Sequence, residues 1–111
     1  MNEKINGLLK DVFNNLTAIF GDKLIDVILF GSYARGDYDE ESDIDIAVII
    51  KEERKDLEKY HRALTDEMTN QTMNNDVIVS FVDIPQTDFE KYKDVLPFYK
   101  KICNEGVRIS A

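Results

Sequence analysis

The feature that most constrains this chain is an apolar run that ends at a glycine–serine pair and is followed, after ten intervening residues, by two aspartates one residue apart. The run from Val27 to Phe30 predicts a buried strand, and Gly31-Ser32 predicts a tight turn whose backbone can approach a ligand closely. A second apolar run, Ile44 to Ile50, begins within the acidic pair. Because alternate residues of a strand point to the same face, we expect Asp43 and Asp45 to present two carboxylates side by side.

A pair of carboxylates held this close is costly unless a positive charge lies between them. A divalent metal ion is the simplest such charge, and ligands that are all oxygen favour magnesium or manganese over zinc. A third aspartate, Asp76, follows the turn signal Asn74-Asn75 and opens an apolar run that is predicted to be another strand. We therefore expect Asp43, Asp45 and Asp76 at matching ends of two neighbouring strands.

The remaining elements follow from periodicity and from turn residues. Apolar residues at helical spacing predict a helix from Ile5 to Phe20, which Gly21-Asp22 ends. The chain is expected to form a single domain over residues 1–111, because it shows no repeat and no linker. The further predictions are strands at 24–30, 43–50 and 76–82, a helical turn at 33–35, helices at 52–73 and 87–92, a last helix from 96–97 to 104–106, and a closing strand or extended tail at 107–109.

Composition excludes some classes of partner. The net charge of −8 argues against a duplex or RNA backbone as the main partner, because such binding depends on neutralising phosphates with Lys and Arg. No apolar run reaches the roughly 18 residues of a membrane span, so a soluble cytoplasmic protein is expected. The single cysteine, Cys103, is interpreted as a core thiol rather than a nucleophile, and the single histidine, His61, as a structural or surface residue. The acidic loop at 37–41 is interpreted as a solvated turn rather than as extra metal ligands.

The central motif is suited to phosphoryl chemistry, which needs metal ions and positioned donors more than covalent participation by the protein. A triphosphate whose metal is bridged by Asp43 and Asp45 would lie against Gly31-Ser32, where backbone N–H groups and the serine hydroxyl donate to phosphate oxygens. Arg35 is expected to contact the triphosphate or the pyrophosphate leaving group. Asp76 is expected near a second metal ion or near the incoming hydroxyl, where it helps to deprotonate the nucleophile.

These residues match a known family. Phe30-Gly31-Ser32-Tyr33-Ala34-Arg35-Gly36 with Ser42-Asp43-Ile44-Asp45 resembles the signature of the DNA polymerase beta type nucleotidyltransferase superfamily, and in particular its minimal nucleotidyltransferase (MNT) branch. Phe98 to Ile102 followed by Glu105-Gly106-Val107 is also similar to that branch, so the resemblance covers nearly the whole chain.

The resemblance implies an α/β (α+β) fold with a small mixed sheet flanked by helices, and Asp43, Asp45 and Asp76 as Mg²⁺-binding carboxylates. It implies transfer of a nucleotidyl group with release of pyrophosphate, and ATP as the substrate. Members of this branch are commonly antitoxins that move AMP from ATP onto a tyrosine hydroxyl of a partner HEPN-domain ribonuclease toxin. The implied partner is therefore a HEPN toxin, in a hetero-oligomer.

Two alternatives remain open at the level of sequence. The first is a binding module that masks the toxin without turnover, and the second is transfer to the hydroxyl of a small molecule such as an antibiotic. The base preference, the acceptor residue and the docking face, whether on the N-terminal or the C-terminal helix, carry no local sequence signature.

Overall fold

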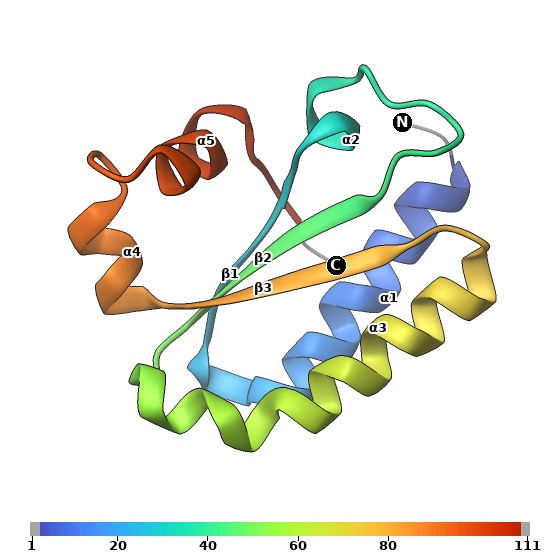
Figure 1. Ribbon diagram of the computed structural model, residues 1–111. Coiled ribbons are helices and arrows are strands. Elements are labelled where there is room, and N and C mark those ends of the chain that lie inside the picture. Colours follow the sequence, from blue (N-terminus) through green and yellow to red (C-terminus); the bar gives the residue numbers. More distant parts are fainter. Residues whose placement is uncertain (1–2, 110–111) are drawn as a thin grey trace.

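A computed structural model describes residues 3–109, which form a four-stranded sheet in the order β3-β2-β1-β4. β1 (Leu24–Phe30) lies at the centre and pairs antiparallel with both β2 (Ile44–Ile50) and β4 (Val107–Arg108). β2 pairs parallel with β3 (Val79–Pro85). The sheet is therefore mixed and flanked by helices, which confirms the expected fold class (Figure 1).

The helices divide between the two faces of the sheet. α1 (Glu3–Phe20) and α3 (His61–Asn75) cover one face, and α4 (Gln86–Tyr92) and α5 (Pro97–Glu105) lie on the other (Figure 1). α2 (Ser32–Arg35) is a single turn that follows β1. Two 3₁₀ helices, η1 (Gly21–Lys23) and η2 (Arg54–Tyr60), complete the connections.

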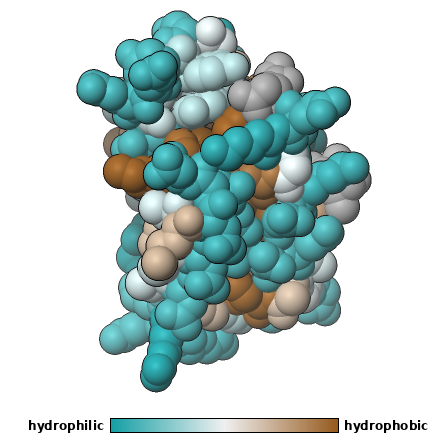
Figure 2. Space-filling view, turned by 90° about the vertical axis from the view of Figure 1, so that its right-hand side faces the viewer, coloured by the Kyte–Doolittle hydropathy of each residue, from teal (hydrophilic) through white to brown (hydrophobic). Residues whose placement is uncertain are grey.

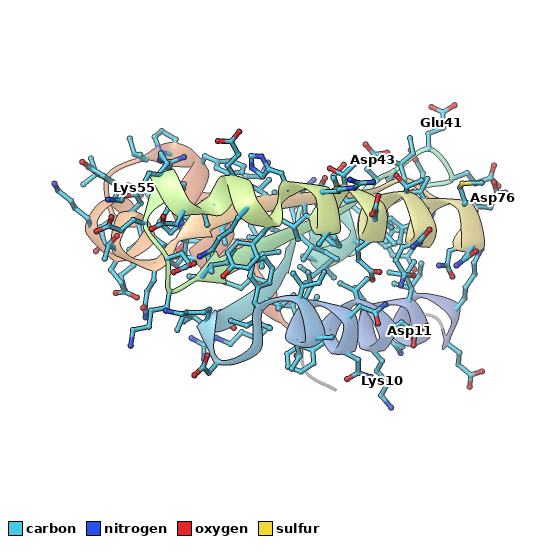
Figure 3. All side chains as sticks on the ribbon, turned by 90° about the horizontal axis from the view of Figure 1, so that it is seen from below. Lys10, Asp11, Glu41, Asp43, Lys55 and Asp76 are labelled. Atoms are coloured by element: carbon cyan, nitrogen blue, oxygen red, sulfur yellow. The ribbon has the colours of Figure 1, made fainter. Side chains whose placement is uncertain are left out.

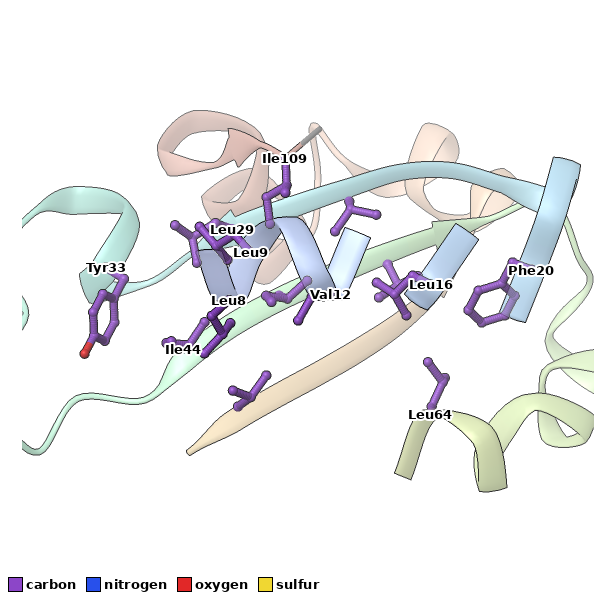
Figure 4. Close-up of a cluster of buried hydrophobic side chains, with 14 of the residues drawn as sticks. Leu8, Leu9, Val12, Leu16, Phe20, Leu29, Tyr33, Ile44, Leu64 and Ile109 are labelled. Carbon is purple, nitrogen blue, oxygen red and sulfur yellow. The ribbon is translucent and has the colours of Figure 1, made fainter. Parts of the chain in front are cut away.

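Strand β2 supplies side chains to both layers because it is covered on both sides, as its unbroken apolar stretch 46–50 indicates. Ile44, Ile46, Val48 and Ile50 belong to the larger core against α1 and α3, whereas Ala47 and Ile49 belong to the smaller core under α4 and α5. The larger core interleaves the apolar face of α1, including Leu8, Val12 and Leu16, with Leu29 and Ile44 of the sheet (Figure 4).

Helix α1 ends where the sequence predicts and forms because of the predicted apolar spacing. Its buried residues recur every three or four positions from Ile5 to Phe20, so one apolar face meets the sheet. Gly21 then adopts φ +58°, a left-handed conformation that glycine tolerates and that ends the helix. One polar network crosses to α3, where Asn15 Nδ2 donates to both carboxylate oxygens of the buried Glu67 at 3.1 and 2.9 Å.

Two predicted boundaries were wrong. The segment predicted as one helix over 52–73 is divided into η2 and α3, and Glu52 holds the first part by accepting from Tyr60 Oη at 3.0 Å and pairing with Lys59 at 2.8 Å. The third strand begins at Val79 rather than at Asp76, because Asp76 ends α3 in the left-handed region at φ +53° and donates its N–H to Thr72 O at 3.1 Å. Both departures come from helix-end contacts that the apolar pattern does not report.

The interpretation of Cys103 as a core thiol was also wrong, since this residue is exposed. On α5 the buried position is Ile102, and a neighbouring residue on a helix is turned by about 100°, here toward solvent. The short closing segment forms β4, which pairs Val107 with Leu29 and Arg108 with Ile28. Within residues 3–109 no helix is long and apolar enough to cross a membrane.

Candidate active site

The site begins where β1 ends, at Gly31. This residue has φ +77° and ψ −157°, a combination that is essentially restricted to glycine. Its carbonyl oxygen accepts from the N–H groups of Ala34 and Arg35 at 3.1 Å each, which closes the single turn of α2. Gly36 ends this turn in the left-handed region at φ +88°. The predicted glycine–serine turn and the helical turn after it are both confirmed.

Asp45 lies directly over Gly31. A Cβ built on Gly31 would stand 2.6 Å from Asp45 Oδ2, so the absence of a side chain at position 31 is what admits the carboxylate. In the sheet, Asp45 pairs with Phe30 of β1 on one side and with Ser80 of β3 on the other. These three side chains share the face of the sheet that carries α4 and α5. The second residue of β2 is thus placed against the turn that the sequence predicts to bind phosphate.

Asp43 acts on Asp45 through its charge. Burial raises the pKa of Asp45 most, the negative charge of Asp43 raises it further, and the positive charge of Lys101 lowers it. Asp43 itself is exposed just before β2 begins, and the N–H of Ile44 donates to Ile78 O at 2.8 Å. The charge of Asp43 thus disfavours the ionised form of Asp45, and a bound cation would relieve this repulsion. The placement of the two carboxylates side by side on one strand face stays a prediction, because Asp43 precedes β2.

Asp76 occupies a different position from the one expected. It is exposed at the C-terminal end of α3, and it lines a shallow cleft together with Asp43, Glu41 and Thr72. Figure 3 shows Asp43, Glu41 and Asp76 at the same end of the molecule. In the part of the chain that the structure describes, no three His, Cys, Asp or Glu side chains converge as a metal site. The role of Asp76 as a third ligand remains a prediction.

Arg35 is held by two carboxylates. Its Nε pairs with Asp37 at 3.2 Å and its Nη1 with Glu105 of α5 at 3.0 Å, and both contacts raise the pKa of the guanidinium. The expected contact of Arg35 with phosphate is untested. The ion pair with Glu105 joins α2 to the end of α5, two elements that lie far apart in the sequence.

The acidic loop after α2 is held by its own hydrogen bonds. Ser42 Oγ accepts from the N–H of Asp39 at 2.9 Å and donates to Asp39 Oδ1 at 3.2 Å, and Asp39 Oδ1 also accepts from the N–H of Glu41. The ring of Tyr38 stacks on that of Tyr33, with 4.2 Å between centroids. This side of the molecule is largely hydrophilic (Figure 2). The contacts agree with the interpretation of the loop as a solvated turn.

Three residues near Asp45 were missed by sequence reasoning. Ser80 is its direct neighbour on β3, Lys101 reaches it electrostatically from α5, and Phe98 contacts the ring of its partner Phe30. Phe98 and Lys101 lie in the C-terminal stretch that resembles the MNT branch, but that resemblance assigned neither residue a role. All three residues are brought to Asp45 by sheet register or by helix packing. The alternation of β3 would have selected Ser80 once its pairing with β2 was known.

A glycine–serine turn closed against an Asp-x-Asp strand, on a small mixed sheet, defines the nucleotidyltransferase class of fold. The chain belongs to the nucleotidyltransferase domain family, whose model matches residues 9–109.

Part of the chain is similar to curated proteins. A relative from Methanocaldococcus jannaschii, named "Putative protein adenylyltransferase MJ0141", is 56% identical over 45 residues, which are 40% of this chain and 46% of that protein. The chain spans about half the length of the curated relatives it matches.

Among solved structures, a complex of tri-AMPylated Shewanella oneidensis HEPN toxin with MNT antitoxin is similar with a TM-score of 0.56 at 19% identity, over 96% of this chain and 72% of the other. A toxin-antitoxin structure with AMP-PNP is similar with a TM-score of 0.55 at 22% identity, over 88% and 72% of the two chains. At these identities the likeness establishes the fold alone.

Proposed function

We propose that this chain is a magnesium-dependent nucleotidyltransferase that transfers AMP from ATP to a tyrosine hydroxyl of a HEPN-domain toxin and so inactivates it as an antitoxin. The observation that carries the proposal is the fit of Asp45 over Gly31, because it sets a carboxylate against an open backbone turn. A toxin-antitoxin complex with AMP-PNP and a tri-AMPylated HEPN toxin among similar structures support ATP as substrate and a HEPN protein as partner.

The donor set fits a hard divalent cation. Asp43 and Asp45 offer only oxygen atoms, the ligand type that Mg²⁺ prefers. Burial and the charge of Asp43 raise the pKa of Asp45, so the ionised form of this carboxylate is disfavoured and a nearby cation would stabilise it. These two residues would hold the ion, with Asp76 as the proposed third carboxylate. When bound, Mg²⁺ would neutralise phosphate charge and favour the departure of pyrophosphate.

The chain's own residues would position the reactants. In the proposed step the tyrosine oxygen attacks the α-phosphorus of ATP, the bond from that phosphorus to the β-phosphate oxygen breaks, and pyrophosphate leaves with the electron pair. Asp76 takes the phenolic proton. Gly31-Ser32 supplies N–H and hydroxyl donors to the phosphates, and Arg35 binds the triphosphate or the leaving pyrophosphate by exchanging one of its carboxylate partners.

The test is the intact mass of the protein encoded by the neighbouring gene, measured after incubation with the chain, ATP and Mg²⁺. We expect a gain of one or more AMP units, and no gain with the Asp43→Asn, Asp45→Asn double variant. Asp94→Asn, an exposed aspartate of the α4–α5 connection, is the matched control and should act like the wild type.

Other outcomes select the alternatives. A stable complex that neutralises the toxin without any mass gain, and that the double variant also forms, would replace catalysis by masking. Consumption of ATP with a small-molecule hydroxyl as acceptor, in the absence of any protein partner, would replace the toxin as substrate.

A further inference from the structure

Helix α5 is fixed beside the carboxylates by contacts at two points. Ile102 is buried in the smaller core with Phe30 and Ala47, and Glu105 pairs with Arg35 of α2 at 3.0 Å. Figure 1 shows α5 and α2 next to each other at the top of the molecule. These two contacts fix the position of α5, and with it the positions of Phe98 and Lys101 on the same helix, relative to Asp45.

Lys101 brings a positive charge to this place. It is exposed, and its charge acts on the carboxylate of Asp45, whose pKa it lowers. Within residues 3–109 it forms no ion pair, whereas the guanidinium of Arg35 is shared between Asp37 and Glu105. Lys101 directly precedes Ile102, which is buried with Phe30, the strand partner of Asp45. The helix therefore places this cation near Asp45, where it can accept a new anionic partner without giving one up.

Phe98 lies one turn before Lys101 on the same helix. Its ring meets that of Phe30 edge to face, with 5.6 Å between centroids and 85° between planes. Phe30 is the strand partner of Asp45, so this contact places Phe98 beside the same site. The residue nevertheless keeps 43% of its surface exposed, which leaves apolar ring area free to stack.

We propose that α5 forms one wall of the nucleotide site, in which Lys101 binds the phosphates of a nucleoside triphosphate and the exposed ring of Phe98 stacks on its base. The inference rests on the proposed function and names two substrate-binding residues that the central motif does not contain. A nucleotide suits this wall because a cation and an aromatic ring one helical turn apart match its two chemistries, anionic phosphate and a flat base. An apolar protein partner would leave Lys101 without a counter-charge.

The test uses nucleotide binding by the chain alone, since that readout needs no acceptor. The chain contains no tryptophan, so Phe98→Trp introduces a single indole at the proposed stacking position, whose emission can be excited apart from that of the five tyrosines. We expect Mg²⁺ with AMP-PNP to change the emission of this indole saturably. Lys101→Ala in the same background should raise the dissociation constant about tenfold, equivalent to about 1.4 kcal/mol. Lys100→Ala, its exposed neighbour, is the matched control and should leave binding unchanged.

Calorimetry on the wild type separates the two proposals. If the wild type binds Mg²⁺ with AMP-PNP and the Lys101→Ala and Phe98→Ala variants bind it equally well, α5 does not form a wall of the nucleotide site, and the proposed function stands. If these variants bind nucleotide normally but lose the toxin complex, the same surface is a protein interface instead. If the wild type binds no nucleotide, both proposals fail.

Discussion

Replacement of Gly31 by alanine tests the geometry on which the site depends. The backbone at this position has φ +77° and ψ −157°, a region in which a non-glycine residue costs about 1–3 kcal/mol. The added Cβ would also stand 2.6 Å from Asp45 Oδ2, closer than any stable contact of this kind. Because the carboxylate is the end of a side chain that can rotate, we expect Asp45 to move rather than the sheet to open.

Gly36 provides the matched control, because it separates backbone strain from displacement of Asp45. It has φ +88° in the left-handed region, where alanine costs about 1–2 kcal/mol, and a Cβ there would meet nothing within 4 Å. Both variants should therefore lose a similar 1–3 kcal/mol of unfolding free energy in urea titrations. Only Gly31→Ala should also abolish the proposed AMP transfer and weaken the stabilisation by Mg²⁺ that the proposed site implies.

The transfer activities of Gly31→Ala and Gly36→Ala decide whether the approach of Asp45 to the turn matters. If Gly31→Ala retains transfer at the level of Gly36→Ala, then close approach of Asp45 to the turn is not needed, and the central argument for the site is wrong. If Gly36→Ala loses transfer as well while remaining folded, the effect of position 31 comes from the shape of the α2 turn rather than from Asp45.

Three further predictions concern stability. Asp45→Asn should raise the unfolding free energy at pH 7 without divalent metal. The pKa of Asp45 is raised above its ordinary value of 3.8 in the folded protein, so the folded state binds this proton more tightly and wild-type stability falls as the pH rises above that value. Urea titrations should therefore show the variant more stable at pH 7 and the two proteins equal at pH 3. Asn15→Ala should cost about 1–3 kcal/mol in urea denaturation, because it leaves the buried Glu67 carboxylate without its two hydrogen bonds from Asn15. Arg35→Ala should cost less than about 1 kcal/mol, since its ion pairs are exposed, and a double-mutant cycle with Glu105→Ala should give a coupling of that size or smaller.

Much of the fold could be predicted because its signals are local. The apolar spacing from Ile5 to Phe20 indicates a helix with one buried face, and the unbroken apolar stretch 46–50 indicates a strand covered on both sides. Each pattern depends only on the backbone repeat of its own element. Where a helix end was decided by contacts, as at Asp76 and in the η2 segment, the same reasoning placed the boundary wrongly.

The sequence by itself determined the turn at Gly31 and the place of Asp45 at the start of β2, because both depend on residues close together in the chain. Tertiary structure alone decided which side chains stand around Asp45. The parallel register of β3 places Ser80 beside it, and the packing of α5 brings Lys101 and Phe98 to the same place. Strand register and helix placement depend on many buried contacts across the whole molecule, so they cannot be predicted from any short stretch of sequence.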